Sequence, residues 1–288
     1  MEKDKHLLKI KSYIQKMPSL PTTVTKIMEL CNDPHTSPAD LNHVISLDPV
    51  LMGKVMKLIN SAYYGLNQEV TSLVRAIIML GINTVKNLSL STAVLGTLKS
   101  AGDSDAINMD GFWRHSLCVG VTSKLIAKHR GVDQKRLEEY FVAGLLHDIG
   151  KIPLNNVISK DYLMAVSYSD RKHCSLFAAE NDVISLNHMD VGKMIVDNWN
   201  LGYEIKDPVS FHHDILSYNG ENVDILYTVV VSNYFANFFE LGYSGDRFPE
   251  KVDNSVWKHL DIDMDYLEEI EERVNGEIEN AQIFLRMV

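Results

Sequence analysis

The sequence predicts an all-α protein built from two helical lobes. Apolar residues recur at the three- and four-residue spacing of helices, and no stretch alternates apolar and polar residues as a half-buried strand would. Proline and glycine signals divide these periodic segments into short helices with tight turns. The small, polar stretch at 100–105 is the best linker candidate. We therefore expect an orthogonal helix bundle in residues 1–105 and a second helical lobe in residues 106–288.

The composition is that of an ordinary globular protein. The 288 residues are 45% hydrophobic and 23% charged, which permits a large buried core and does not indicate disorder. The formal net charge of −10 argues against a nucleic acid as the main partner, because binding to a phosphate backbone depends on clustered lysines and arginines. We therefore expect no nucleic-acid partner.

Cysteine usage and hydropathy indicate the cytoplasm. The three cysteines are far apart and form no Cys-x-x-Cys pair, which is typical of buried thiols in a reducing compartment. No stretch approaches the roughly 18 consecutive apolar residues that a membrane span needs, and the charged start of the chain lacks the apolar core of a signal peptide. The sequence thus predicts a cytoplasmic protein without a membrane span.

The opening segment predicts an amphipathic helix that the prolines at 18 and 21 end. Its apolar residues are spaced as one helical face: Leu7, Ile10, Ile14 and Met17. Such a helix packs either on the surface of the domain or on a membrane surface, and we favour the first.

Further short helices are expected from Thr22 to Leu98. Ser37 and Asp48, each followed by proline, read as helix caps, and Thr71 or Ser72 opens the next helix. Gly81 breaks that helix, and Asn83 is expected to cap the following one. The run Tyr-Tyr-Gly at 63–65 ends a helix, where aromatic packing is a better expectation than a docking surface.

In the second lobe the Phe-Trp-x-His run at 112–115 is expected to lead into an apolar helix, and a helix at 136–146 ends in a His-Asp pair. Asn187 should cap a helix that runs to Trp199, and Pro208 should start the next. A strongly apolar helix at 223–239 is followed by a loop and two helices, the last of them acidic.

The run Gly-Leu-Leu-His-Asp-Ile-Gly-Lys at 144–151 carries the most concentrated chemistry. At a helix end, His147 and Asp148 can converge on one cation. Their donor atoms suit Zn, Mn or Fe, and a carboxylate also suits Mg. Lys151 offers a cation for an anionic ligand such as phosphate. An isolated pair of this kind is more often an ordinary helix C-terminus with a glycine cap, here Gly150, although glycine also permits a close approach.

The pair is not isolated, because four more histidines stand near the starts or ends of apolar helices: His115, His188, His212 and His213. One buried histidine is usually a satisfied core residue, but five histidines and an aspartate on four helices favour a metal centre. Adjacent helical residues point about 100° apart, so His212 and His213 suit either a two-metal cluster or one metal ligand and one outer group. We expect all six residues to converge in one pocket.

These residues resemble the HD superfamily of metal-dependent phosphohydrolases, with Asn233 as the late polar residue in an apolar helix. The spread of histidines from 188 to 213 is similar to the two-metal HD-GYP branch. The first half resembles HDOD proteins, the HD-related output domains of bacterial signalling, in its runs at 17–21, 45–49, 60–65 and 78–81. The resemblance covers nearly all of the chain. It implies an all-helical bacterial protein with an HD-like second lobe, a signal-transduction role and often no demonstrated catalysis.

The sequence departs from these families at its metal ligands. Asn233 stands where the superfamily has an aspartate, and its amide oxygen can bind a cation but brings no negative charge. Gly111 stands one helical turn before His115, where the HD-GYP branch has a glutamate, and the Gly-Tyr-Pro signature is missing after His213. HDOD domains often lose the His-Asp pair, which this chain keeps. The resemblance therefore implies a metal site with few carboxylates.

Two functions from different classes fit the sequence. The first is a regulatory, non-catalytic module that docks to signalling proteins and senses a nucleotide or phosphate ligand or holds a structural metal. The second is a metal-dependent phosphohydrolase or phosphodiesterase for a nucleotide-type phosphoester, with Asp148 and Lys151 in catalysis. Its one or two ions of Fe, Mn, Zn or Mg would be held by His115, His147, Asp148, His188, His212, His213 and Asn233. The missing carboxylates favour the regulatory module.

Overall fold

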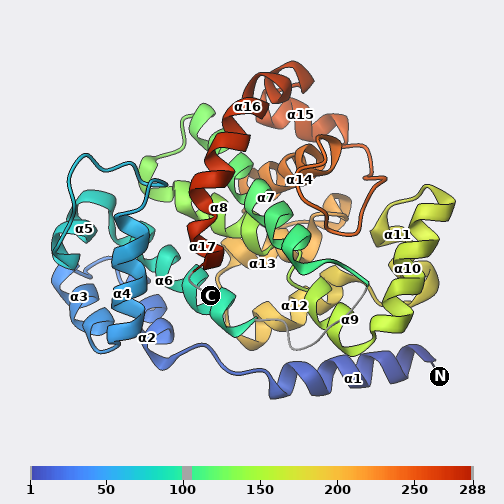
Figure 1. Cartoon of the computed structure of the whole chain (residues 1–288), viewed down its shortest axis with the longest axis horizontal. Helices are drawn as coiled ribbons and strands as arrows, with labels where there is room; N and C mark the ends of the chain where they lie inside the picture. The colour runs from blue at the N-terminus through green and yellow to red at the C-terminus, as the bar shows by residue number, and fades with distance from the viewer. Residues whose placement is uncertain (1, 99–105, 287–288) are drawn as a thin grey trace.

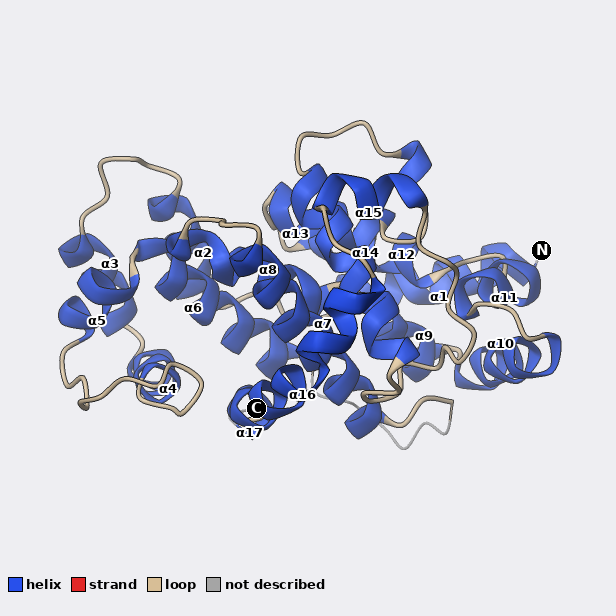
Figure 2. Cartoon of the chain, turned by 90° about the horizontal axis from the view of Figure 1, so that it is seen from above, coloured by secondary structure: helices blue, strands red, loops and turns tan. Residues whose placement is uncertain are grey.

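The computed structural model describes residues 2–98 and 106–286, and these residues form helices joined by turns and loops (Figure 1). No strand occurs in these two ranges, which confirms the all-α fold class (Figure 2). The linker expected at 100–105 lies outside the described residues. The division of the chain near residue 105 stays a prediction.

The helices of the first part follow the sequence signals. They are α1 (Glu2–Lys16), α2 (Thr22–Cys31), α3 (Pro38–Ser46), α4 (Pro49–Ile59), α5 (Leu73–Leu80) and α6 (Ile82–Thr97). Side-chain oxygens of Ser37, Asp48 and Ser72 cap α3, α4 and α5 as expected. Asn83 does not cap α6, contrary to the prediction. Gly81 ends α5 and begins α6 at a φ of +90°, a conformation that side chains disfavour.

The second part contains eleven described α-helices. They are α7 (Met109–His129), α8 (Leu137–Leu146), α9 (Lys151–Val157), α10 (Ser159–Lys172), α11 (Leu176–Val183), α12 (His188–Asn198), α13 (Tyr203–Phe211), α14 (Val223–Phe238), α15 (Asn254–Leu260), α16 (Met264–Ala281) and α17 (Ile283–Arg286). Asn187 caps α12 through its side chain, as predicted. Three helices rather than two follow the loop after α14.

Two helix starts in this part were predicted too late. Asn108 caps α7, so His115 lies inside the helix rather than before it. Pro208 does not start α13, because Gly202 takes the extended cap position and Pro208 lies inside the helix. Inside a helix a proline cannot donate the backbone hydrogen bond, and its ring crowds the carbonyl of the residue four positions earlier, so Pro208 weakens this helix locally.

Helices α7 and α8 pack backbone to backbone at two glycines. A Cβ on Gly120 would lie 2.8 Å from the carbonyl oxygen of Phe141, and a Cβ on Gly144 would lie 2.8 Å from that of Val119. Since neither glycine leaves room for a side chain, the two helices approach closely. This contact sets the second turn of α7 beside the end of α8, where the His-Asp pair lies.

Helix α1 packs on the domain, as the sequence favoured. Its residues Ile10 and Ile14 are buried, and it contacts α9 and α12 (Figure 1). The indole N–H of Trp199, just after α12, donates to the carbonyl oxygen of Pro18 at 3.3 Å. Among the described residues, no single helix has the length and apolar character to cross a membrane. Helices α5 and α6 pass that test only as a pair, and the pair is bent by 114°.

Candidate metal centre

The His-Asp pair lies in the turn between α8 and α9. Gly150 has a φ of −66°, so it does not form the left-handed glycine cap of an ordinary helix end. It is required for space instead, because a Cβ there would lie 1.9 Å from the carbonyl oxygen of His188 and 2.5 Å from the backbone nitrogen of Gly192. The glycine thus lets the start of α12, which carries His188, lie against the turn.

Asp148 is fully buried at the centre of the histidines. Its Oδ2 atom lies 3.3 Å from Nε2 of His147 and 3.8 Å from Nε2 of His115. Its Oδ1 atom lies 3.3 Å from Nε2 of His188 and 3.5 Å from Nε2 of His212. One carboxylate therefore faces two pairs of imidazoles, one pair with each oxygen.

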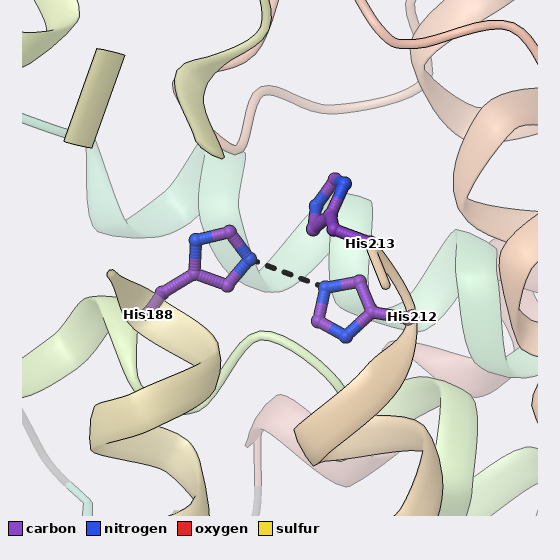
Figure 3. Close-up of side chains that lie close together, drawn as sticks. All are labelled: His188, His212 and His213. Atoms are coloured by element: carbon purple, nitrogen blue, oxygen red, sulfur yellow. Dashed lines mark hydrogen bonds between the residues drawn. The ribbon is translucent and has the colours of Figure 1, made fainter. Parts of the chain in front are cut away.

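The candidate ligands form two groups, each with its ligand atoms within 4.8 Å of one another. Group one consists of His115, His147 and Asp148, and group two consists of His188, His212 and His213 (Figure 3). The structure thus brings together all five histidines and the aspartate that the sequence singled out. Their role as metal ligands stays a prediction.

Hydrogen bonds fix the orientation of three of the rings. Nδ1 of His147 lies 2.7 Å from the carbonyl oxygen of Gly144, and Nδ1 of His212 lies 2.8 Å from that of Pro208. A carbonyl oxygen only accepts, so each Nδ1 carries the proton and each Nε2 presents a lone pair to the centre. Nδ1 of His188 lies 2.6 Å from a carboxylate oxygen of Glu180, which gives the same tautomer when that group is ionised.

Burial disfavours the charged form of four of the five imidazoles, those of His115, His188, His212 and His213. It lowers the pKa of His115, His188 and His212 to about 3, although the nearby Asp148 carboxylate opposes the shift in each case. Burial, together with His212, also holds the pKa of His213 well below its usual range. Neutral imidazole is the form that binds a metal ion.

Lys151 forms an ion pair with the central carboxylate. Its Nζ lies 2.7 Å from Oδ2 of Asp148, and its side chain is almost fully buried. Burial favours the neutral form of Asp148, but His147 and Lys151 outweigh it and hold the pKa of Asp148 well below its usual range. The ammonium of Lys151 therefore pairs with Oδ2, the same oxygen of Asp148 that faces His147 and His115.

Asn233 and Gly111 lie at the edge of group one. Asn233 lies against His115 and favours its protonated form, although neither ring nitrogen of His115 makes a hydrogen bond. A Cβ on Gly111 would lie 3.3 Å from the Cβ of Tyr243, so the loop after α14 fills the space beside it. Group one therefore has one carboxylate, as the sequence implied.

Group two has two glutamates that the sequence did not identify. Glu180 on α11 is buried and accepts from the backbone N–H of His188 at 2.9 Å and from the hydroxyl of Tyr162 at 2.8 Å. Burial raises the pKa of Glu180 to about 8. Glu250, in the loop after α14, has a carboxylate oxygen 3.9 Å from Nδ1 of His213. Two carboxyl groups therefore lie beside the histidines of group two, and the expected shortage of carboxylate charge at the metal stays a prediction.

A small cavity of about 180 Å³ reaches this centre. His212, His213, Asn233 and Glu250 are among the residues that line it. Group two and Asn233 therefore have a route to solvent, whereas His115, His147 and Asp148 are fully buried.

The donor atoms fit a divalent cation. Both ring nitrogens of His115, Nε2 of His147 and Oδ1 of Asp148 are buried and make no hydrogen bond. Buried polar atoms without a hydrogen-bond partner cost free energy, and a cation bound to the lone pairs among them would reduce that cost. A set dominated by imidazole nitrogen suits Fe, Mn or Zn better than Mg, which prefers oxygen.

Comparisons with known proteins agree with this fold. The family model described as "HDOD domain" matches residues 17–215, and an uncharacterised protein of Treponema pallidum is 22% identical over 239 residues. That alignment covers 83% of this chain but only 46% of the relative, so this chain spans less than half of its length.

Three solved structures are similar to this chain. An HDOD domain protein of unknown function from Geobacter sulfurreducens has a TM-score of 0.76 at 23% identity and covers 97% of each chain. A candidate signal transduction protein from Marinobacter aquaeolei has a TM-score of 0.74 at 19% identity, covering all of this chain and 66% of that one. A candidate phosphohydrolase from Shewanella amazonensis has a TM-score of 0.70 at 19% identity, covering 96% and 98%. At these identities the structures establish the fold alone, whereas the family model matches well over half of the sequence: the chain belongs to the HDOD domain family.

Proposed function

We propose that this chain is a regulatory module of bacterial signal transduction that acts by binding, and that its metal centre holds a divalent cation without efficient turnover. The observation that carries the proposal is the buried ion pair between Lys151 and Asp148. A cation that binds group one competes with this ammonium for Oδ2 of the only carboxylate in the group. The other members of the group, His115 and His147, and the neighbouring Asn233 bring no negative charge.

This arrangement favours a metal ion that is bound without catalysing a reaction. A lone carboxylate already paired with lysine leaves little negative charge to anchor a cation, since the imidazoles contribute none. Group two has more carboxyl groups close to its histidines, because Glu180 orients His188 and Glu250 lies near His213. We therefore assign group two as the tighter metal position and group one as the weaker one. Docking of a signalling partner is the output that the HDOD family membership supports.

Metal analysis of protein purified without an affinity-tag histidine tests this proposal, followed by calorimetric titration of chelator-treated protein with Mn²⁺ and Zn²⁺. The expected result is one tight site and a second that fills only at higher metal concentration. His188→Ala should remove the tight site, and His147→Ala should weaken the second. Absence of any binding in the native protein would contradict a metal centre.

A phosphohydrolase is the second candidate, and the cavity at His212 and His213 is the observation that favours it. A bound divalent ion supplies charge stabilisation for a phosphoryl group and lowers the pKa of water. In that reaction Asp148 would hold the cation in place, and Lys151, released from Asp148, would stabilise charge on the phosphoryl oxygens. A hydrolysis assay distinguishes the two candidates.

A further inference from the structure

Helix α1 begins the first part of the chain but packs on the second part. Its main helix contacts are with α9 and α12, and it lies along these helices at one edge of the molecule (Figure 1). Residues 17–21 then lead to α2, and Pro18 and Pro21 each fix a backbone φ angle in this short connection. A movement of α1 would therefore change how the two parts of the chain are joined.

The two helices that α1 contacts both start at the metal centre. Helix α9 begins at Lys151, whose ammonium pairs with Asp148, and α12 begins at His188, a member of group two. The two starts are in backbone contact, because a Cβ on Gly150 would lie 1.9 Å from the carbonyl oxygen of His188. Since packed helices move as rigid elements, a change at either start reaches the surface on which α1 lies.

A series of hydrogen bonds connects α1 to group two by a second route. Nε2 of His6 on α1 lies 3.1 Å from Oδ2 of Asp161 on α10. The next residue, Tyr162, donates to Glu180 on α11 at 2.8 Å, and Glu180 accepts from the backbone N–H of His188 at 2.9 Å. Both routes from α1 therefore end at the first residue of α12.

Few side chains hold α1 in place. Among its described side chains, only His6, Ile10 and Ile14 are buried. The carbonyl oxygen of Pro18, just after α1, accepts from the indole N–H of Trp199 at 3.3 Å. A helix of 15 residues is marginal on its own in water, so α1 depends on this packing. Its release should therefore require less free energy than global unfolding.

We propose that the docking of α1 on α9 and α12 is coupled to the binding of a divalent cation at group two, so that each stabilises the other. The structure with α1 docked is the one in which Nε2 of His188 and Nε2 of His212 lie 3.2 Å apart. A cation bound by these two residues would hold the start of α12 in the position that α1 contacts. The inference rests on the proposed metal centre and adds a route by which its occupancy reaches the first part of the chain.

Hydrogen–deuterium exchange of the full chain measures the coupling, with chelator-treated protein compared with protein saturated with Zn²⁺. The backbone amides of α1 should exchange at least about fivefold more slowly with Zn²⁺ bound, which is the lower end of usual coupling between two sites. Helix α4 serves as the internal control, because its main contacts are with α3, α5 and α6. Its amides should exchange at the same rate with and without Zn²⁺.

The double variant Ile10→Ala/Ile14→Ala tests the same coupling from α1. It removes the buried apolar contacts of α1 and introduces a strong helix former, so the rest of the chain should keep its fold. Because coupling between two binding events is reciprocal, affinity for Zn²⁺ in calorimetric titration should fall at least about fivefold. The matched control is Leu8→Ala/Gln15→Ala, on exposed positions of the same helix, which should bind Zn²⁺ like the native protein.

Three results would overturn the coupling. Zn²⁺ that binds the native protein without slowing the exchange of α1 overturns it alone, and so does a double variant that binds Zn²⁺ as tightly as the native protein. Failure of the native protein to bind Zn²⁺ overturns the metal centre together with the coupling, so the two proposals are distinguishable. In chelator-treated protein the double variant should also speed exchange in the first turn of α12, and an unchanged rate there would contradict the connection from α1 to His188.

Discussion

The Nε2 atoms of His188 and His212 lie 3.2 Å apart in group two (Figure 3). Nδ1 of His212 donates to a carbonyl oxygen, and Nδ1 of His188 donates to Glu180 when that carboxyl is ionised. In that state the two Nε2 lone pairs face each other. Such a contact is repulsive unless a proton or a metal ion lies between the two nitrogens. This contact is a reason for our proposal that group two is the tighter metal position.

Glu180→Gln tests the group that orients His188. Burial raises the pKa of Glu180 to about 8 in the metal-free protein, and a bound cation favours its ionised form. The substitution keeps the shape of the side chain but cannot supply that negative charge, so affinity for Zn²⁺ should fall by about 10–100-fold. Calorimetric titration measures the change. Asp182→Asn, on the same helix but bonded only to the hydroxyl of Tyr168, is the matched control and should bind Zn²⁺ like the native protein. Equal affinity in both variants would exclude Glu180 from the centre.

Lys151→Met tests whether the ammonium of Lys151 and a metal ion compete for the carboxylate of Asp148. Without metal, Asp148 is left buried and unpaired, so the free energy of unfolding should fall by about 3–5 kcal/mol. With the ammonium gone, the weaker metal site should bind Mn²⁺ more tightly, and added Mn²⁺ should restore the lost stability. Denaturant unfolding with and without Mn²⁺ measures both effects.

Lys193→Met is the control for that variant, because it breaks the exposed ion pair with Asp197 and should cost no more than about 1 kcal/mol. If Lys151→Met lowers stability and added Mn²⁺ does not restore it, Asp148 is not a metal ligand.

Asn233→Asp restores the carboxylate that the HD superfamily has at this position. A second negative charge beside His115 should raise Mn²⁺ affinity by about tenfold, which corresponds to about 1.4 kcal/mol, without loss of the fold. Asn198→Asp makes the same charge change on an exposed residue at the last position of α12, away from His115, and is the matched control. Identical titrations for the two variants would mean that Asn233 does not reach the cation.

Acid should destabilise the metal-free protein. The folded-state pKa of His115, His188 and His212 is about 3, below the unfolded value of about 6.5, so the unfolded chain binds more protons in this range. The stability that these neutral histidines provide is complete above pH 6.5 and is lost as pH falls. At pH 5 the loss is up to about 2 kcal/mol for each histidine. Chelator-treated protein melted between pH 7.5 and 5 measures it, and a flat profile would contradict burial as neutral imidazoles.

Local sequence signals were sufficient for most of the fold. Caps at Ser37, Asp48 and Asn187 placed helix starts correctly, because the capping side chain and the helix that it starts are neighbours in sequence. The errors arose where two local rules competed. Pro208 carries a helix-start signal, but Gly202 already supplied the cap of the same helix.

The candidate centre was only partly visible in the sequence. His147 and Asp148 are adjacent, and the remaining histidines stand out because the residue type is rare in apolar helices. Glu180 gave no such signal, since it lies on a short helix and meets His188 across a turn. Glu250 meets His213 only through the path of a long loop. Both contacts depend on tertiary packing, which the spacing of apolar residues in the sequence does not predict.

Hydrolysis of a chromogenic phosphodiester by native protein loaded with Mn²⁺ tests the central claim most directly. The paired Lys151 and the missing Asn233 carboxylate predict little or no turnover above a control without protein, at metal concentrations that fill both sites. His147→Ala, assayed in parallel, should not differ from the native protein. Vigorous hydrolysis by the native protein that disappears in His147→Ala would contradict the regulatory module and establish a phosphohydrolase.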